Sequence, residues 1–127
     1  MSIQLQEQKR SKSALAFITS QKDNPSIDNN ELLTWSSQFP TLVHTAGLGQ
    51  ACAFFKSRSN VAAARELYQH LNTWLAIEFE NLFGPSHQAK DLLDVITMVN
   101  SQQYRLLQSE TQAYLQWVKQ LSKAYLK

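Results

Sequence analysis

Residue types that catalyse reactions or bind metals occur in this chain, but their spacing does not assemble a site. The three histidines lack the spacing of helical zinc ligands, two histidines four residues apart with a glutamate; they are His44, His70 and His87. The carboxylate pairs Asp91 with Asp94 and Glu78 with Glu80 have no histidine or serine beside them that completes a catalytic set, so they read as solvated helix faces. We therefore expect no catalytic residue, no metal, no cofactor and no small-molecule substrate.

The glycines and the single cysteine favour packing over chemistry. Gly47 and Gly49 lack the strand-then-helix context of a nucleotide-binding loop, so we interpret them as packing glycines, at a close approach of another backbone or at a bend. Cys52 lies in an apolar run and is expected to be inert. One cysteine excludes an internal disulfide and fits a reducing cytoplasm, where we expect the protein to be located.

The basic residues carry more information than the net charge of +2. Residues 1–22 hold four bases and one acid, residues 23–103 hold four bases and eight acids, and residues 104–127 again hold four bases and one acid. Within the acidic middle, residues 41–65 carry three bases and no acid. Clustered bases of this kind favour an anionic partner, although a solvated helix face accounts for any single lysine equally well.

The last predicted helix concentrates its bases on one side. At roughly 100° per residue, a stripe about 80° wide holds only bases, amides and a serine: Arg105, Ser109, Gln112, Gln116, Lys119, Lys123 and Lys127. Glu110 lies about 140° from Arg105, well off this stripe. The opposite side is apolar or small: Leu107, Thr111, Tyr114, Leu115, Val118, Leu121 and Tyr125. Such a ridge suits contact with nucleic-acid phosphates, and it also suits plain solubility.

Five further bases are candidates for the same contact. Lys56 and Arg58 end a helix, where the macrodipole gives them a structural explanation as well. Arg105, already counted in the stripe, begins a helix, where the macrodipole gives no such explanation; this leaves RNA, a partner carboxylate or pairing within the chain. Three more bases lie in the N-terminal segment and touch either RNA or nothing: Lys9, Arg10 and Lys12.

The elements that position these residues are helical. With 127 residues, three glycines and three prolines, the chain predicts one domain over residues 1–127, with residues 1–8 expected to fray. Apolar residues recur at three- and four-residue steps and no strand alternation occurs, so we expect an all-α compact bundle of five to six helices. Apolar runs stay near four residues against the roughly 20 that a membrane helix needs, so we expect no membrane contact.

Breakers and caps divide the bundle. We expect a first helix over 5–20 and a long second helix over 29–58, started by Asp28 and bent or broken at Pro40. Ser59 and Asn60 should end it and cap a third helix over 61–83. Ser86 should cap a short helix ending near 99. Asn100 or Ser101 should then cap the last helix, which extends to the C-terminus.

Two segments resemble a known family. GLGQACAFFKSR, residues 47–58, and YRLL at 104–107 with Glu110 and the WVK at 117–119 resemble the small helical subunit of the Cmr complex, the type III-B CRISPR RNA-silencing effector. The motif residues that carry the resemblance are Gly47, Leu48, Gly49, Gln50, Phe54, Tyr104 and Trp117. It spans roughly residues 5–125. Cys52 and Phe55 stand where aliphatic residues are usual, and Gln120 stands where a second base is common.

The resemblance implies an all-helical, non-enzymatic subunit that takes part in antiviral defence. Copies of such subunits stack beside the larger backbone subunits, build the groove for the guide–target RNA duplex and contact RNA phosphates. The implied partners are the other Cmr subunits, further copies of the chain, guide RNA and target RNA. The alternative is a free-standing helical nucleic-acid-binding regulator, which would need a helix-turn-helix with a basic second helix.

Overall fold

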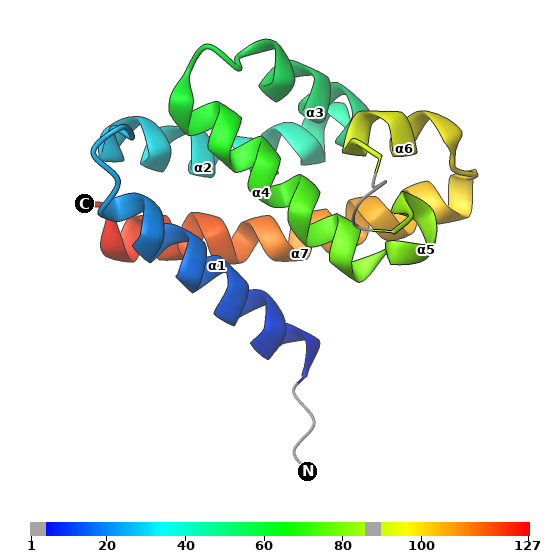
Figure 1. The fold of residues 1–127 in the computed structure, drawn as a ribbon, viewed down its shortest axis with the longest axis horizontal. Coiled ribbons are helices and arrows are strands. Elements are labelled where there is room, and N and C mark those ends of the chain that lie inside the picture. The colour runs from blue at the N-terminus through cyan, green and yellow to red at the C-terminus, as the bar shows by residue number, and fades with distance from the viewer. Residues whose placement is uncertain (1–4, 86–89) are drawn as a thin grey trace.

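The computed structural model describes residues 5–85 and 90–127, and within them the chain forms helices only (Figure 1). They are α1 (Gln6–Lys22), α2 (Asn29–Ala46), α3 (Leu48–Ser57), α4 (Ala62–Glu78), α5 (Glu80–Phe83), α6 (Leu92–Met98) and α7 (Ser101–Tyr125). The all-α compact fold is confirmed. The described ranges hold seven helices rather than five or six, because two of the expected helices are each divided. None of them combines the length and the apolar character that a membrane span requires.

The longest helix, α7, runs along one side of the molecule and is the base on which the others pack (Figure 1). α1 and α2 make the most extensive contacts with it, whereas α3 packs mainly against α2 and α4 and reaches α7 at its first turn. The core between the helices takes fully buried side chains from all seven of them: Ile18, Leu32, Phe39, Phe55, Leu71, Leu75, Phe83, Leu92 and Tyr114 among others. Burial of these apolar faces is the main force that holds the helices together.

The expected helix over 29–58 breaks at Gly47, not at Pro40. Gly47 has φ 88° and ψ 161°, a conformation that is essentially restricted to glycine, and it separates α2 from α3. Pro40 lies inside α2 and is buried beside Phe39 and near Val43. Tertiary packing therefore offsets the roughly 3 kcal/mol that a proline costs inside a helix.

The expected helix over 61–83 also divides. Phe79, with φ −123° and ψ 46°, leaves the helical region and separates α4 from α5. The caps predicted at Ser59 and Asn60 are wrong, because α4 begins after Val61, which offers no side-chain oxygen. The turn between α3 and α4 instead closes through backbone hydrogen bonds, including one from Val61 N to Arg58 O of 2.9 Å.

Two of the predicted caps are confirmed. The Asp28 carboxylate accepts hydrogen bonds from the backbone N–H groups of Asn30 and Glu31, at 2.8 and 3.2 Å. Asn100 and Gln103 exchange side-chain-to-backbone hydrogen bonds in a reciprocal capping box at the start of α7. The cap predicted at Ser86 lies outside the described residues, and α6 begins after Asp91.

Candidate nucleic-acid interface

The start of α3 is attached to α7 through two of its backbone N–H groups. The first-turn N–H groups of a helix have no partner within the helix and need one elsewhere. Here Leu48 N donates to Gln108 Oε1 at 2.9 Å, and Gly49 N donates to Tyr104 Oη at 2.9 Å. A Cβ added at Gly49 would lie 3.5 Å from that hydroxyl, which is ordinary contact. Side chains of α7, rather than another backbone, therefore lie beside the two glycines, and the space there would admit a Cβ.

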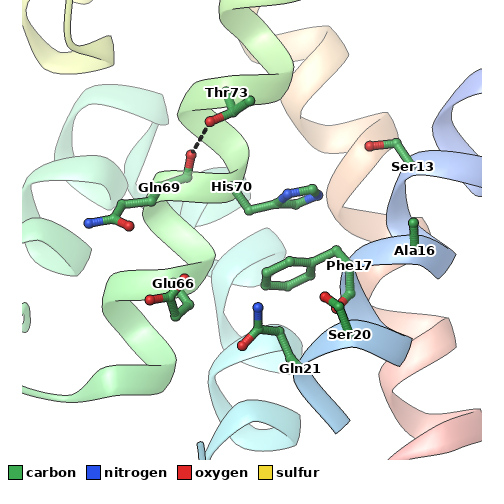
Figure 2. Close-up of a pocket in the computed structure, with 9 residues that line it drawn as sticks. All are labelled: Ser13, Ala16, Phe17, Ser20, Gln21, Glu66, Gln69, His70 and Thr73. Atoms are coloured by element: carbon green, nitrogen blue, oxygen red, sulfur yellow. Dashed lines mark hydrogen bonds between the residues drawn. The ribbon is translucent and has the colours of Figure 1, made fainter. Parts of the chain in front are cut away.

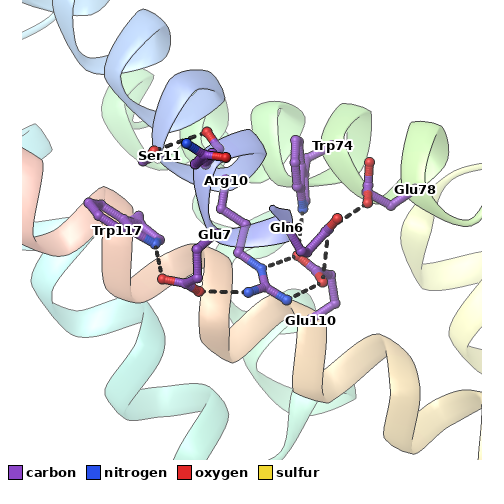
Figure 3. A network of polar contacts seen from close by, with 9 residues as sticks. Gln6, Glu7, Arg10, Ser11, Trp74, Glu78, Glu110 and Trp117 are labelled. Carbon is purple, nitrogen blue, oxygen red and sulfur yellow. Dashed lines mark hydrogen bonds and ion pairs between the residues drawn. The ribbon is translucent and has the colours of Figure 1, made fainter. Parts of the chain in front are cut away.

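Glu110 is the centre of a second junction, which joins α1, α4 and α7 (Figure 3). Its carboxylate accepts two hydrogen bonds of 2.8 Å from the Arg10 guanidinium and one of 3.1 Å from Trp74 Nε1. Gln6 donates to Glu110 as well and to Glu78. The Arg10 and Glu110 side chains are only 16% and 10% exposed, so this ion pair is largely removed from water. The three helices are therefore fixed to one another at this point.

A neutral hydrogen-bonded cluster lies one turn further along the same three helices. Tyr114 Oη on α7 is 2.8 Å from Ser13 Oγ on α1 and is hydrogen-bonded to His70 Nε2 on α4. The His70 ring stacks face to face on the Phe17 ring, with 4.0 Å between centroids, and both rings line the groove between α1 and α4 (Figure 2). Burial lowers the pKa of His70 to about 4 and raises that of Tyr114. Both groups are thus uncharged at neutral pH.

The predicted division of α7 into two faces is confirmed. The residues buried on it are Leu107, Thr111, Tyr114, Leu115, Val118 and Ser122, and all lie on the side expected to face the core. One expectation is wrong, since Tyr125 is 42% exposed at the last turn of the helix. The stripe on the other side is open: Arg105, Ser109, Gln116, Lys123 and Lys127 are exposed, and Gln112 and Lys119 are half-buried.

The bases of this stripe differ from Arg10 in having no carboxylate partner. Among the described residues, Arg105, Lys119 and Lys123 form no ion pair, whereas Arg10 binds both Glu7 and Glu110. Along the helix axis, Arg105 and Lys123 are about 27 Å apart at 1.5 Å per residue. The stripe is thus a row of free cations on a rigid helix that the two junctions hold in place.

Two of the other candidate bases, Lys56 and Arg58, have side-chain partners outside this stripe. Lys56 Nζ is 3.1 Å from Asp91 Oδ2, and the Arg58 guanidinium lies 4.9 Å from the centre of the Phe54 ring. Burial raises the pKa of Asp91, but hydrogen bonds from Tyr68 and Lys56 outweigh it and lower that pKa overall. Lys9 and Lys12 are exposed on α1. The structure therefore does not assemble all the candidate bases into one surface.

Comparison with known proteins identifies the family and the fold of the chain. The family model described as "CRISPR-associated protein (Cas_Cmr5)" matches residues 6–125, nearly the whole chain. The chain belongs to the Cmr5 family. A crystal structure of a CRISPR-associated Cmr5 family protein from Thermus thermophilus superposes with a TM-score of 0.80 at 22% identity, covering 98% of this chain and 100% of that one. At this identity the superposition shows the fold alone, and no curated protein matches the sequence.

The Cmr5 resemblance read from two distant segments has a direct structural basis. Gly47, Leu48 and Gly49 of the first segment contact Tyr104 and a neighbouring residue of the second. Leu48 is fully buried, Gln50 is exposed and Phe54 is 37% exposed. Trp117 is half-buried and donates through Nε1 to Glu7 at 3.0 Å. Gly47, Leu48, Gly49 and Tyr104 of the motif thus mark the contact between α3 and α7.

The sequence does not reveal the partners of Arg10, or the contacts by which the first turn of α1 is attached to α4 and α7. Residues 6–8, part of the segment predicted to fray, belong to α1, and Gln6 and Glu7 contact α4 and α7. Residues 1–4, which belong to the same predicted segment, lie outside the described part of the chain. Glu110 stands a hundred residues from Arg10, so no local pattern could pair them. The available signal was that Glu110 is the single acid of the last helix.

Proposed function

We propose that this Cmr5-family chain is a non-catalytic structural subunit of a type III-B CRISPR (Cmr) effector ribonucleoprotein. In this role it stacks with further copies of itself and with the backbone subunits, and it helps to build the groove that holds guide and target RNA. Its partners are then the other Cmr subunits, guide RNA and target RNA. Family membership over residues 6–125 and the shared fold support this assignment.

The observation that carries the RNA contact is the acid-free stripe of α7. Arg105, Lys119 and Lys123 project from one side of a rigid helix and have no carboxylate partner among the described residues. Exposed amides, such as that of Gln116, lie between these bases and can donate hydrogen bonds to phosphate or ribose oxygens. Three cations give weak binding for one copy, and stacked copies would add their contacts along one RNA.

A helix-turn-helix regulator is the less favoured alternative. α3 and α4 are joined by a four-residue turn, residues 58–61, which resembles that motif in length. A recognition helix is basic and exposed, however, and α4 carries one arginine against two glutamates. One face of α4 is also buried in the core from Ala63 to Leu75. α4 is therefore poorly suited to serve as the recognition helix of such a motif.

Co-purification tests the subunit assignment. The chain is expressed with the other Cmr subunits and a guide RNA, and the assembled particle is isolated through a tag on another subunit. We expect this chain to be recovered in the particle. A particle that assembles fully without it would contradict the assignment.

A charge reversal on the stripe tests the RNA contact within the assembled particle. The variant Arg105→Glu with Lys119→Glu should reduce target RNA capture at least tenfold while the melting temperature of the subunit stays within a few degrees of wild type. The matched control, Arg65→Glu with Lys90→Glu, makes the same change in net charge outside α7. Equal loss of capture in both variants, or a parallel loss of melting temperature, would contradict a direct contact by the stripe.

A further inference from the structure

We infer that the groove beside Trp117 is a stacking site for one unpaired nucleobase of an RNA strand whose phosphates lie on the α7 stripe. This inference rests on the proposed function and adds a base-binding site to it. The groove has a volume of about 320 Å³ and is lined by Glu7, Ala113, Gln116, Trp117 and Gln120. Four of these five residues belong to α7, and Glu7 comes from α1.

The groove adjoins the cationic stripe. Gln116 belongs to both, and Gln120, Ala113 and Trp117 follow it around the helix at increasing angles from the stripe. Lys119 and Lys123 lie within two turns of the helix from Gln116. A strand whose phosphates contact these lysines would therefore present its bases toward the neighbouring face, where the groove opens.

The aromatic wall of the groove is held in position before any ligand arrives. Trp117 Nε1 donates to Glu7 Oε2 at 3.0 Å, and the other oxygen of Glu7 accepts from Arg10 at 2.7 Å (Figure 3). Arg10 is in turn bound to Glu110. Ala113, one turn earlier than Trp117, has a side chain too small to fill the space beside the indole. Because the ring is already oriented, stacking a base on it costs little conformational entropy.

The lining of the groove combines an apolar surface with a smaller polar part. Most of its exposed surface is apolar, which suits stacking of a planar ring beside Trp117, and the amides of Gln116 and Gln120 with the Glu7 carboxylate add polar groups that a nucleobase can pair and an apolar peptide segment cannot. The amides of Gln116 and Gln120 can donate and accept hydrogen bonds, and the Glu7 carboxylate can accept from an exocyclic amino group. At this small volume the groove suits a single planar group.

Tryptophan fluorescence tests this inference on the full chain. The wild type is titrated at low salt with a fluorescently labelled oligoadenylate of about 12 nucleotides and with an abasic oligoribonucleotide of the same length, and anisotropy follows binding. We expect the oligoadenylate to quench emission and to bind about 5- to 100-fold more tightly than the abasic strand, the range given by stacking one base. In Trp117→Phe the quenching should disappear while binding persists, because Trp74 is buried and Trp35 lies on another helix.

A matched pair of variants separates stacking from packing. Trp117→Phe and Trp117→Leu both lose the bond to Glu7, and only the first retains a ring. The leucine variant should lose the preference for oligoadenylate over the abasic strand, and the phenylalanine variant should keep most of it. Equal binding of the two strands by wild type, or quenching that survives in Trp117→Phe, would overturn the base site and leave the phosphate contact standing. Failure of both strands to bind would count against both proposals. Occlusion of Trp117 by another protein subunit in the assembled particle would also overturn the base site.

Discussion

Arg10 binds α7 from α1, and Arg105 is itself a residue of α7, but their surroundings differ. Arg10 is 16% exposed at its side chain and binds two carboxylates, and through Glu110 it joins α1 to α7. Arg105 is exposed on the other side of the helix and has no carboxylate partner among the described residues. One side of α7 is thus used to hold the fold together, and the other is left free.

The comparison teaches that a candidate RNA contact needs bases that lack a carboxylate partner and also lie in a row on one helix face, rather than cations as such. Removal of one partner of a buried ion pair leaves an uncompensated charge and is costly. Removal of an exposed base changes stability by little, because water already solvates it. The two sides of α7 should therefore respond to mutation in different measurements, and this difference can be tested.

The largest effect on stability is expected at the Glu110 junction. Arg10→Met should lower the free energy of unfolding by about 3 kcal/mol, since it leaves the Glu110 carboxylate largely buried without its cation. Urea denaturation followed by circular dichroism measures this change. Adding Glu110→Gln should recover part of the loss, because the amide oxygen still accepts from Trp74 and the buried charge is gone. A single variant as stable as wild type would show that this junction does not hold the helices.

Acid should weaken the cluster formed by Tyr114 and His70. His70 has a pKa of about 4 in the folded chain, below its ordinary 6.5, so the unfolded state binds more protons between these values. The stability that comes from neutral, half-buried His70 is complete above pH 6.5 and is lost as the pH falls toward 4, by about 3 kcal/mol in total. Melting temperatures measured between pH 4 and pH 6.5 test this loss of stability. His70→Gln should flatten the decline, and His44→Gln, at an exposed position, should leave it unchanged.

The two glycines of the GLGQ segment should differ in their tolerance of alanine. Gly47→Ala should cost about 1–3 kcal/mol, because its φ of 88° with ψ near 160° is strained for any residue with a Cβ. Gly49 is helical and its added Cβ would make only ordinary contacts, so Gly49→Ala should be neutral or stabilising by up to about 1 kcal/mol. Chemical denaturation of both variants measures the difference. Equal costs would contradict the assignment of the helix break to Gly47 alone.

Periodicity predicted the helices and the buried face of α7 because both follow from residues close in sequence. Of the residues of α7 that spacing alone assigns to the core, five are buried: Leu107, Thr111, Tyr114, Leu115 and Val118. The breaks were harder to predict. Pro40 is tolerated inside α2 because packing supports it, whereas the break at Gly47 depends on a backbone angle that composition does not reveal.

The candidate interface could be predicted only in part, for a similar reason. The stripe of α7 is formed by residues close in sequence, so the helical period alone predicts it. The difference between Arg10 and the stripe depends on a carboxylate 100 residues away, and the groove at Trp117 depends on a side chain from α1. Tertiary contacts of this separation have no signature in a single sequence.

Neutralising the stripe is expected to have the smallest effect on the free energy of unfolding and the largest effect on RNA affinity. Arg105→Gln, Lys119→Gln and Lys123→Gln together should change the free energy of unfolding by less than about 0.5 kcal/mol, because all three bases lack partners among the described residues. Thermal and urea denaturation measure this change. A loss of several kcal/mol would assign these bases to the fold and abolish the contrast with Arg10.

The most direct test of that contrast is the salt dependence of RNA binding by this triple variant. Affinity for a single-stranded RNA is measured by anisotropy over a range of salt concentrations, for the wild type, the triple variant and a control with Arg65→Gln and Lys90→Gln. If the three bases contact phosphates, the slope of log affinity against log salt should fall by about 2 in the triple variant and stay unchanged in the control. An unchanged slope in the triple variant, with RNA still bound, would contradict the account.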